Sequence, residues 1–190
     1  MSSHFYAMLS RMKNIYRWGL MRNTSPENLS EHSLETAFIA HALAIIGNKR
    51  LSKNYNPEYA AVTAMFHDTS EIITGDLPTP VKYYNPEIIT AYKQIENTAE
   101  SSLLDLLPQD LRPEIEKYYK PQDDIKKLVK AADKLSALIK CIEEINMGNK
   151  EFISAKKATE TAIKNLNCPE ADIFTEEFLG SFSLNLDELK

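Results

Sequence analysis

The sequence predicts an all-α protein, a single globular domain over residues 1–190 built as a bundle of roughly six to eight helices. Three observations support this fold class. Apolar residues recur at helical intervals over most of the chain. No run of alternating β-branched residues is long enough to suggest a sheet. The length of 190 residues suits one domain with a substantial core, and only five of these residues are glycine.

The first two elements follow from periodicity and from residues that start and stop helices. We expect a first helix over residues 3–16 and a polar loop over residues 23–27. A second helix begins near Asn28, where Glu31 has the spacing of a capping box, and ends at Gly47. Because this helix is apolar on nearly all sides, we expect it to be enclosed by the rest of the fold.

The third helix is predicted to carry most of the chemistry. It begins at Pro57 and continues to Ile73, and Gly75 stops it. Residues 76–80 contain two prolines and therefore form a rigid loop. Further helices are expected over residues 86–107, 111–118, 121–148 and 150–166, and the tail after Pro169 is expected to dock through its phenylalanines.

Composition limits the classes of partner and location. Lysine and arginine total 22 against 27 acidic residues, and the net charge of −5 argues against binding a nucleic-acid polymer. No apolar run approaches the ~20 residues of a membrane span, so we expect no membrane association. The spacing of Cys141 and Cys168 suits neither a metal site nor a disulfide scaffold, which favours the reducing cytoplasm. The basic, acid-poor residues 1–26 resemble a transit peptide in composition, but Trp18 and the helical spacing favour an anion site in the mature fold.

A histidine and two carboxylates lie close together in the third predicted helix. Glu71 comes four residues after His67 and three after Asp68, so it lies on the same helical face between them. Burying such groups unpaired among apolar neighbours costs several kcal/mol, and a divalent metal ion would compensate them. A lone His-Asp pair on a helix is otherwise usually a surface pair or a satisfied polar pair.

Two further residues extend this group. His32 lies in the first turns of the second helix, and Asp133 lies among small and apolar residues of a later helix. Periodicity alone slightly favours Asp133 as a surface partner of Lys130 or Lys134 over enclosure with a cation. A helix bundle can bring all four metal-binding candidates, His32, His67, Asp68 and Asp133, to one interior point. Mixed nitrogen and oxygen ligands suit several divalent metals, and the absence of a cysteine ligand disfavours a structural zinc site.

The order His, then His-Asp, then Asp resembles that of the HD-domain metal-dependent phosphohydrolases. Most of the chain is similar to the bacterial 5'-deoxynucleotidases, which dephosphorylate deoxyribonucleoside 5'-monophosphates. The matching stretches are Ser10-Arg11, Arg17-Trp18, Leu20 to Asn23, Asn28, Ser30 to Leu34, His67-Asp68, Ser70-Glu71, Thr74 to Tyr83 and Lys130 to Leu135. The resemblance implies an HD-domain bundle, one divalent ion (Co, Mn, Zn, Ni, Cu, Fe or Mg), a deoxyribonucleoside 5'-monophosphate as substrate, and a homodimer.

The matching residues have chemically sensible roles beside such a metal. The expected catalytic residues are Glu71, Arg17 and Asp76, and the expected substrate-binding residues are Arg17, Trp18, His32, Asp68, Asp76, Leu77, Pro78 and Thr79. Arg17 offers a planar charged fork for phosphate, and Glu71 is placed to move protons of the attacking water or the leaving oxygen. Asp76 would contact the sugar or protonate the leaving oxygen. The alternatives are a solvated Arg17, a core Trp18, a Glu71 that orients His67 and an Asp76 that caps a turn.

Two other functions remain open from the sequence. One is an HD hydrolase of another nucleotide, such as a triphosphate, a cyclic nucleotide or an alarmone. A triphosphate would require more basic residues beside the site than Arg17 and its few basic neighbours provide. The other is a non-catalytic helical module with a vestigial metal site, which predicts that a ligand or Glu71 has been lost. None of them is lost in this chain.

Overall fold

The computed structural model describes residues 2–189 and is all-α over that range. The α-helices are α1 (Phe5–Leu9), α2 (Leu29–Arg50), α3 (Pro57–Phe66), α4 (Glu71–Thr74), α5 (Thr79–Lys82), α6 (Pro86–Leu104), α7 (Arg112–Tyr119), α8 (Asp123–Asn146), α9 (Ile153–Asn165) and α10 (Pro169–Phe178). The 3-10 helices are η1 (Ser10–Asn14), η2 (Lys150–Phe152) and η3 (Leu179–Ser183). Within this range seven α-helices have at least eight residues, and none is long and apolar enough to cross a membrane. The predicted all-α class is confirmed.

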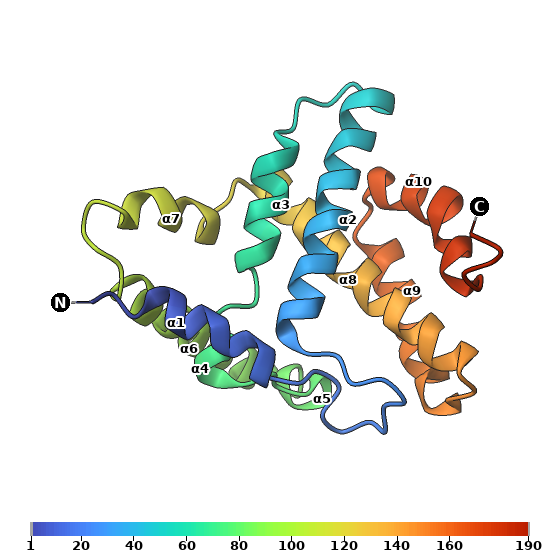
Figure 1. Cartoon of the computed structure of the whole chain (residues 1–190), viewed down its shortest axis with the longest axis horizontal. Coiled ribbons are helices and arrows are strands. Elements are labelled where there is room, and N and C mark those ends of the chain that lie inside the picture. Colours follow the sequence, from blue (N-terminus) through green and yellow to red (C-terminus); the bar gives the residue numbers. More distant parts are fainter. Residues whose placement is uncertain (1, 190) are drawn as a thin grey trace.

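The two longest helices, α2 and α8, form the centre of the fold (Figure 1). Leu43 of α2 and Leu135 and Leu138 of α8 are at most 1% exposed within one continuous apolar core. Helix α3 packs along α2, while α9 packs on α8 and α10 packs on α2 (Figure 1). This arrangement brings the first turns of α2, the end of α3 and the middle of α8 together.

Helix α2 begins as predicted but ends later than predicted. Asn28 accepts hydrogen bonds from the backbone of Ser30 and Glu31, and the Glu31 side chain completes the capping box. The helix then continues through Gly47 to Arg50. A Cβ at Gly47 would lie 2.6 Å from the ring of Tyr55, so the glycine serves close packing between segments rather than helix termination.

The predicted third helix is in fact two helices joined by a turn. Helix α3 ends at Phe66, residues 67–70 form the turn, and α4 begins at Glu71. Two side chains form hydrogen bonds to backbone carbonyl groups at the end of α3. His67 Nδ1 lies 2.6 Å from the Ala64 oxygen, and Thr69 Oγ1 donates to the Phe66 oxygen at 2.9 Å. Gly75 ends α4 with a φ of 72°, as predicted. The loop after it is shorter than predicted, because α5 begins at Thr79.

The two ends of the chain agree with prediction in outline. The first predicted helix is divided into α1 and η1, and Arg17 N then donates to the Glu27 oxygen at 3.0 Å, which closes the loop between η1 and α2. In the C-terminal segment Phe174 is 6% exposed, and Phe182 packs against the same core, so this segment docks as expected.

Candidate active site

Four side chains from separate parts of the chain converge at one point. They are His32 on α2, His67 and Asp68 in the turn after α3, and Asp133 on α8. One potential ligand atom from each lies within 4.8 Å of the others. The structure therefore brings together all four predicted metal ligands.

The contacts within this cluster leave two imidazole nitrogens without a hydrogen bond. His32 Nε2 lies 3.2 Å from Asp133 Oδ1, and His67 Nε2 lies 3.0 Å from Asp68 Oδ2. Both nitrogens are buried, and neither has a hydrogen-bonding partner among residues 2–189. His67 Nδ1 faces the Ala64 carbonyl, which can only accept, so the ring donates through Nδ1 and keeps its Nε2 lone pair for a ligand. Two nitrogen and two carboxylate ligands fit a divalent ion of the first transition series or Mg²⁺.

The electrostatics of the cluster also favour a cation. Burial is the largest influence on both histidines and lowers the pKa of His32, whereas Asp68, Asp133 and the Ala64 carbonyl together outweigh it at His67 and raise that pKa to about 9. Burial opposes ionisation of Asp68 and Asp133, but the two histidines, joined at Asp133 by Lys134, hold both pKa values below their usual range. The carboxylates are thus anionic at neutral pH, and a divalent ion can take the place of the histidine's proton.

Asp133 pairs with a lysine and also faces the cluster, so it has both of the environments that periodicity left open. Its Oδ2 accepts from Lys134 Nζ at 2.9 Å, while its Oδ1 faces His32 inside the cluster. The Asp133 side chain is 19% exposed and the Lys134 side chain 33%. Periodicity slightly favoured an exposed ion pair for Asp133. The ion pair with Lys134 is present, but Asp133 is largely buried and also faces the cluster.

Arg17 is held between two carboxylates rather than solvated. Its Nε donates to Glu27 Oε2 and its Nη1 donates to Asp68 Oδ2, both at 3.3 Å. Burial would lower the pKa of Arg17, but Asp133, Asp68 and the other nearby carboxylates raise it above its usual value. Two of the five guanidinium donors are thus occupied, and the others can bind an anion beside the cluster.

Trp18 is fixed by the same loop. Its Nε1 donates to Glu27 Oε2 at 2.8 Å, and its ring centroid lies 5.2 Å from that of Phe152. Its backbone has a positive φ of 60°. These contacts match the packing alternative for Trp18, and its contact with a base or sugar stays a prediction.

The two predicted proton-transfer residues both have raised pKa values. Burial, followed by the charges of Asp68 and Asp76, raises the pKa of Glu71 to about 9. Glu71 Oε2 is buried and has no hydrogen-bonding partner among the described residues. Burial also raises the pKa of Asp76, while Arg17 and the Trp18 backbone oppose that shift. Both carboxyl groups are therefore poised to exchange protons near the cluster.

The remaining predicted substrate-binding residues lie outside the four-residue cluster. Leu77 and Pro78 are partly exposed, and exposed Thr79 begins α5. They follow Asp76, whose carboxyl group interacts electrostatically with Arg17 and Asp68. Their contact with a sugar or a base stays a prediction.

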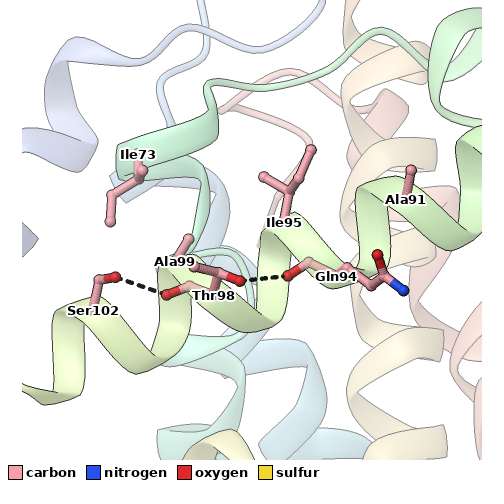
Figure 2. A pocket seen from close by; sticks show the side chains of 7 residues that line it. All are labelled: Ile73, Ala91, Gln94, Ile95, Thr98, Ala99 and Ser102. Atoms are coloured by element: carbon pink, nitrogen blue, oxygen red, sulfur yellow. Dashed lines mark hydrogen bonds between the residues drawn. The ribbon is translucent and has the colours of Figure 1, made fainter.

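Two cavities differ in their relation to the cluster. One of 670 Å³ lies between α6, α7 and α8 and has His67 and Asp133 in its wall. That size suits a small-molecule ligand. The other, of 370 Å³, lies between Ile73 of α4 and one face of α6, and none of the four cluster residues lines it (Figure 2). Only the first cavity opens onto candidate metal ligands.

The structure reveals three residues that the sequence analysis missed. Glu27 accepts from both Arg17 and Trp18, and no local pattern marks it in the sequence. Ser136 lies 3.0 Å from His32 Nδ1 and donates to Glu35 at 2.5 Å. Glu35 and Ser136 each lie three residues after a predicted ligand on a helix, and this same-face spacing could have identified them.

Comparison with known proteins agrees with this geometry. The chain matches the 5'-deoxynucleotidase YfbR-like family over residues 4–182. It is 50% identical to a 5'-deoxynucleotidase of Vibrio parahaemolyticus over 190 residues, which cover 98% of both chains. It is 52% identical to a 5'-deoxynucleotidase of Yersinia pseudotuberculosis over 192 residues, covering 98% of this chain and 96% of the relative.

Solved structures share the fold at lower identity. An HD-domain phosphohydrolase of Listeria innocua superposes with a TM-score of 0.81 at 22% identity, covering 94% of this chain and 88% of the other. An HD phosphohydrolase of cyanophage S-2L, bound to dA and one catalytic Zn²⁺, gives 0.67 at 19% identity, covering 92% and 96%. Because the family match spans nearly the whole chain and the relatives are about half identical over their full length, this protein belongs to the 5'-deoxynucleotidase YfbR-like family.

Proposed function

We propose that the chain hydrolyses deoxyribonucleoside 5'-monophosphates to a deoxyribonucleoside and phosphate, with His32, His67, Asp68 and Asp133 holding one divalent ion. The observation that carries the proposal is the pair of buried, unpartnered Nε2 atoms facing two carboxylates. The names of the half-identical relatives support the same reaction. We treat residues 1–190 as one HD domain, because α9 and α10 pack on the helices that carry the ligands.

The reaction needs a cation, an anion-binding group and a route for protons. A bound divalent ion supplies a Lewis acid for a phosphoryl oxygen and lowers the pKa of a water molecule. Arg17 binds the phosphate through the guanidinium donors that Glu27 and Asp68 leave available. His32 and Asp68 border the same phosphate. With the ion, Arg17 offsets roughly the two negative charges of a phosphate monoester, whereas a triphosphate brings more.

Two carboxyl groups account for the protons. The positive charge of a bound divalent ion would lower the pKa of Glu71, which is about 9 in the metal-free protein. The ionised Glu71 then accepts a proton from the attacking water as the water oxygen bonds to phosphorus. Asp76 returns a proton to O5' as the P–O5' bond breaks, which its raised pKa favours. Trp18, Leu77 and Pro78 border the base and offer flat or apolar surfaces that tolerate different bases, while Thr79 lies near the sugar hydroxyls. The preference for deoxyribose comes from the family likeness and not from any residue that we can name.

The substrate class is tested by phosphate release from a panel of nucleotides. The panel contains deoxyribo- and ribonucleoside 5'- and 3'-monophosphates and triphosphates, each with several divalent metals. We expect turnover of deoxyribonucleoside 5'-monophosphates with several bases. Strong triphosphate hydrolysis, or equal rates on ribo- and deoxyribonucleotides, would favour the alternative of another HD hydrolase. No turnover of any nucleotide would favour the non-catalytic module.

Replacing Arg17 with lysine should reduce kcat/KM even though the charge is kept. The three donors of an ammonium group radiate from one nitrogen, so lysine cannot reproduce the contacts of Arg17 with Glu27 and Asp68 together with a bidentate contact to phosphate. A charge-assisted hydrogen bond contributes ~1.5–3 kcal/mol, or about 10- to 100-fold in rate. The matched control is Arg22→Lys, since the Arg22 side chain is 94% exposed and pairs with Glu151. Kinetics of both variants on the best monophosphate decide the matter. Equal activity of Arg17→Lys and the control would show that Arg17 does not bind the substrate phosphate.

A homodimer in the cytoplasm is the assembly and location that we infer. Leu34, Phe38 and Ile45 are 51%, 69% and 40% exposed and share one face of α2, where a second copy would cover them. The thiols of Cys141 and Cys168 are free, which suits a reducing compartment. Light scattering should give twice the chain mass of 21.6 kDa, and a monomer at micromolar concentration would contradict the dimer.

A further inference from the structure

A chain of two hydrogen bonds leads from the candidate ligand His32 to a carboxylate on the same helix. His32 Nδ1 lies 3.0 Å from Ser136 Oγ, and Ser136 Oγ lies 2.5 Å from Glu35 Oε2. His32 and Ser136 are both 0% exposed, and only the Glu35 end of this hydrogen-bond chain is partly exposed. Glu35 comes from α2, like His32, whereas Ser136 lies on α8 one turn after Asp133.

The order of donors along this chain selects one tautomer of His32. Burial raises the pKa of Glu35 to about 7, and above that pH the Ser136 hydroxyl donates its single proton to the Glu35 carboxylate. Ser136 Oγ can then only accept from the imidazole, so the His32 ring proton lies on Nδ1. The Nε2 lone pair consequently faces Asp68 and Asp133, where a metal ion would bind.

The opposite tautomer would compete with the metal. With its proton on Nε2, His32 could donate to Asp133 Oδ1, which lies 3.2 Å away, and both ligand atoms would be occupied. His67 cannot readily adopt the corresponding tautomer, because its Nδ1 proton is held by the backbone carbonyl of Ala64, which no side-chain substitution removes. Only His32 depends on side chains for its orientation.

Resting on the metal centre proposed above, we propose that Ser136 and Glu35 are positioning residues that hold His32 as the Nδ1–H tautomer and thereby set the affinity for the divalent ion. Partners that orient a metal-bound histidine typically change metal affinity by ~10–100-fold when removed. Neither residue touches the substrate. Their effect passes through His32 alone.

The first test measures the Kd for Co²⁺ by competition with a chelator in the purified full-length chain. Ser136→Ala should weaken binding by ~10–100-fold. Ser33→Ala is the matched control, because it removes a hydroxyl that is equally buried on α2 but has no partner among the described residues. Glu35→Gln keeps an acceptor for the Ser136 hydroxyl, so it should weaken binding less than Glu35→Leu does.

The second test reads the tautomer directly in the metal-free protein. The chain has four histidines, so their imidazole ¹⁵N signals can be assigned by substituting His4 and His41. The wild type should show His32 protonated at Nδ1, and Ser136→Ala should move the proton to Nε2. If Ser136→Ala does not fold, Glu35→Leu, at a partly exposed position, provides the same readout.

The outcomes separate this inference from the metal centre itself. If the wild type binds no divalent ion, the proposed function fails. If the wild type binds the ion and Ser136→Ala and Glu35→Leu bind it as tightly as Ser33→Ala does, the metal centre stands and the positioning role is wrong. An unchanged His32 tautomer in both variants would equally overturn the positioning role.

Discussion

Replacing Glu71 with glutamine should lower turnover by ~10²–10⁴-fold, the usual contribution of a proton-transfer group, while the divalent ion and the nucleotide still bind. Glutamine keeps the size of Glu71 but cannot accept a proton from the attacking water. Glu71 Oε2 is buried without a hydrogen-bonding partner among residues 2–189, so no protein donor competes for it once a bound divalent ion has lowered the pKa of the group. Turnover, metal content and nucleotide affinity of the variant test the prediction together.

The same substitution should stabilise the metal-free protein. Burial and two nearby carboxylates raise the pKa of Glu71 from 4.5 to about 9, so the folded state holds a proton that the unfolded state releases. The stability from this group is fully present below pH 4.5 and is lost as the pH rises towards 9. At pH 7 this costs on the order of 3 kcal/mol, which neutral glutamine avoids. Thermal unfolding of metal-free Glu71→Gln should therefore occur at a higher temperature than that of the wild type at pH 7.

A buried carboxylate elsewhere supplies the control for Glu71. Glu170 is 3% exposed and accepts from Tyr55, far along the chain from the cluster. Glu170→Gln should leave turnover per folded molecule unchanged. If Glu71→Gln stays within a few-fold of wild-type activity, Glu71 is structural and another group moves the proton.

Replacing Asp68 with alanine should remove the metal ion and with it nearly all phosphate release. Asp68 Oδ2 lies 3.0 Å from His67 Nε2 and 3.6 Å from His32 Nε2, so this single oxygen is within reach of both ligand nitrogens. Losing it leaves three ligands and removes a negative charge that attracts the cation. Metal analysis should give about one ion per wild-type chain and close to none for Asp68→Ala.

Stability measurements add a readout that does not depend on turnover. An ion at 100 times its Kd stabilises the wild type by ~2.7 kcal/mol, so added metal should raise its Tm and should not raise that of Asp68→Ala. Asp105→Ala is the control, because Asp105 is 61% exposed and pairs with Arg112 at the surface. Unchanged metal content in Asp68→Ala would remove Asp68 from the ligand set.

Local sequence signals predicted many of the helix boundaries but not the interruption beside the site. Asn28 and Glu31 start α2 as a capping box, and Gly75 ends α4, because these effects involve neighbouring residues only. The break after Phe66 depends on the side chains of His67 and Thr69 taking helical carbonyls. Apolar periodicity continues through that break and therefore does not reveal it.

For the site, too, some features could be predicted from the sequence and others depend on tertiary contacts. Composition and periodicity predicted the all-α class, and the resemblance to the HD-domain phosphohydrolases predicted His32, His67, Asp68 and Asp133 as metal ligands. Only the tertiary structure decided that Asp133 contacts both Lys134 and the cluster. It also decided that Glu27 binds Arg17 and Trp18. The chain from His32 through Ser136 to Glu35 is likewise present only in the folded protein. The physical reason is distance along the chain: Ser136 follows His32 by 104 residues, and only packing of α8 against α2 brings a hydroxyl within 3.0 Å of that imidazole.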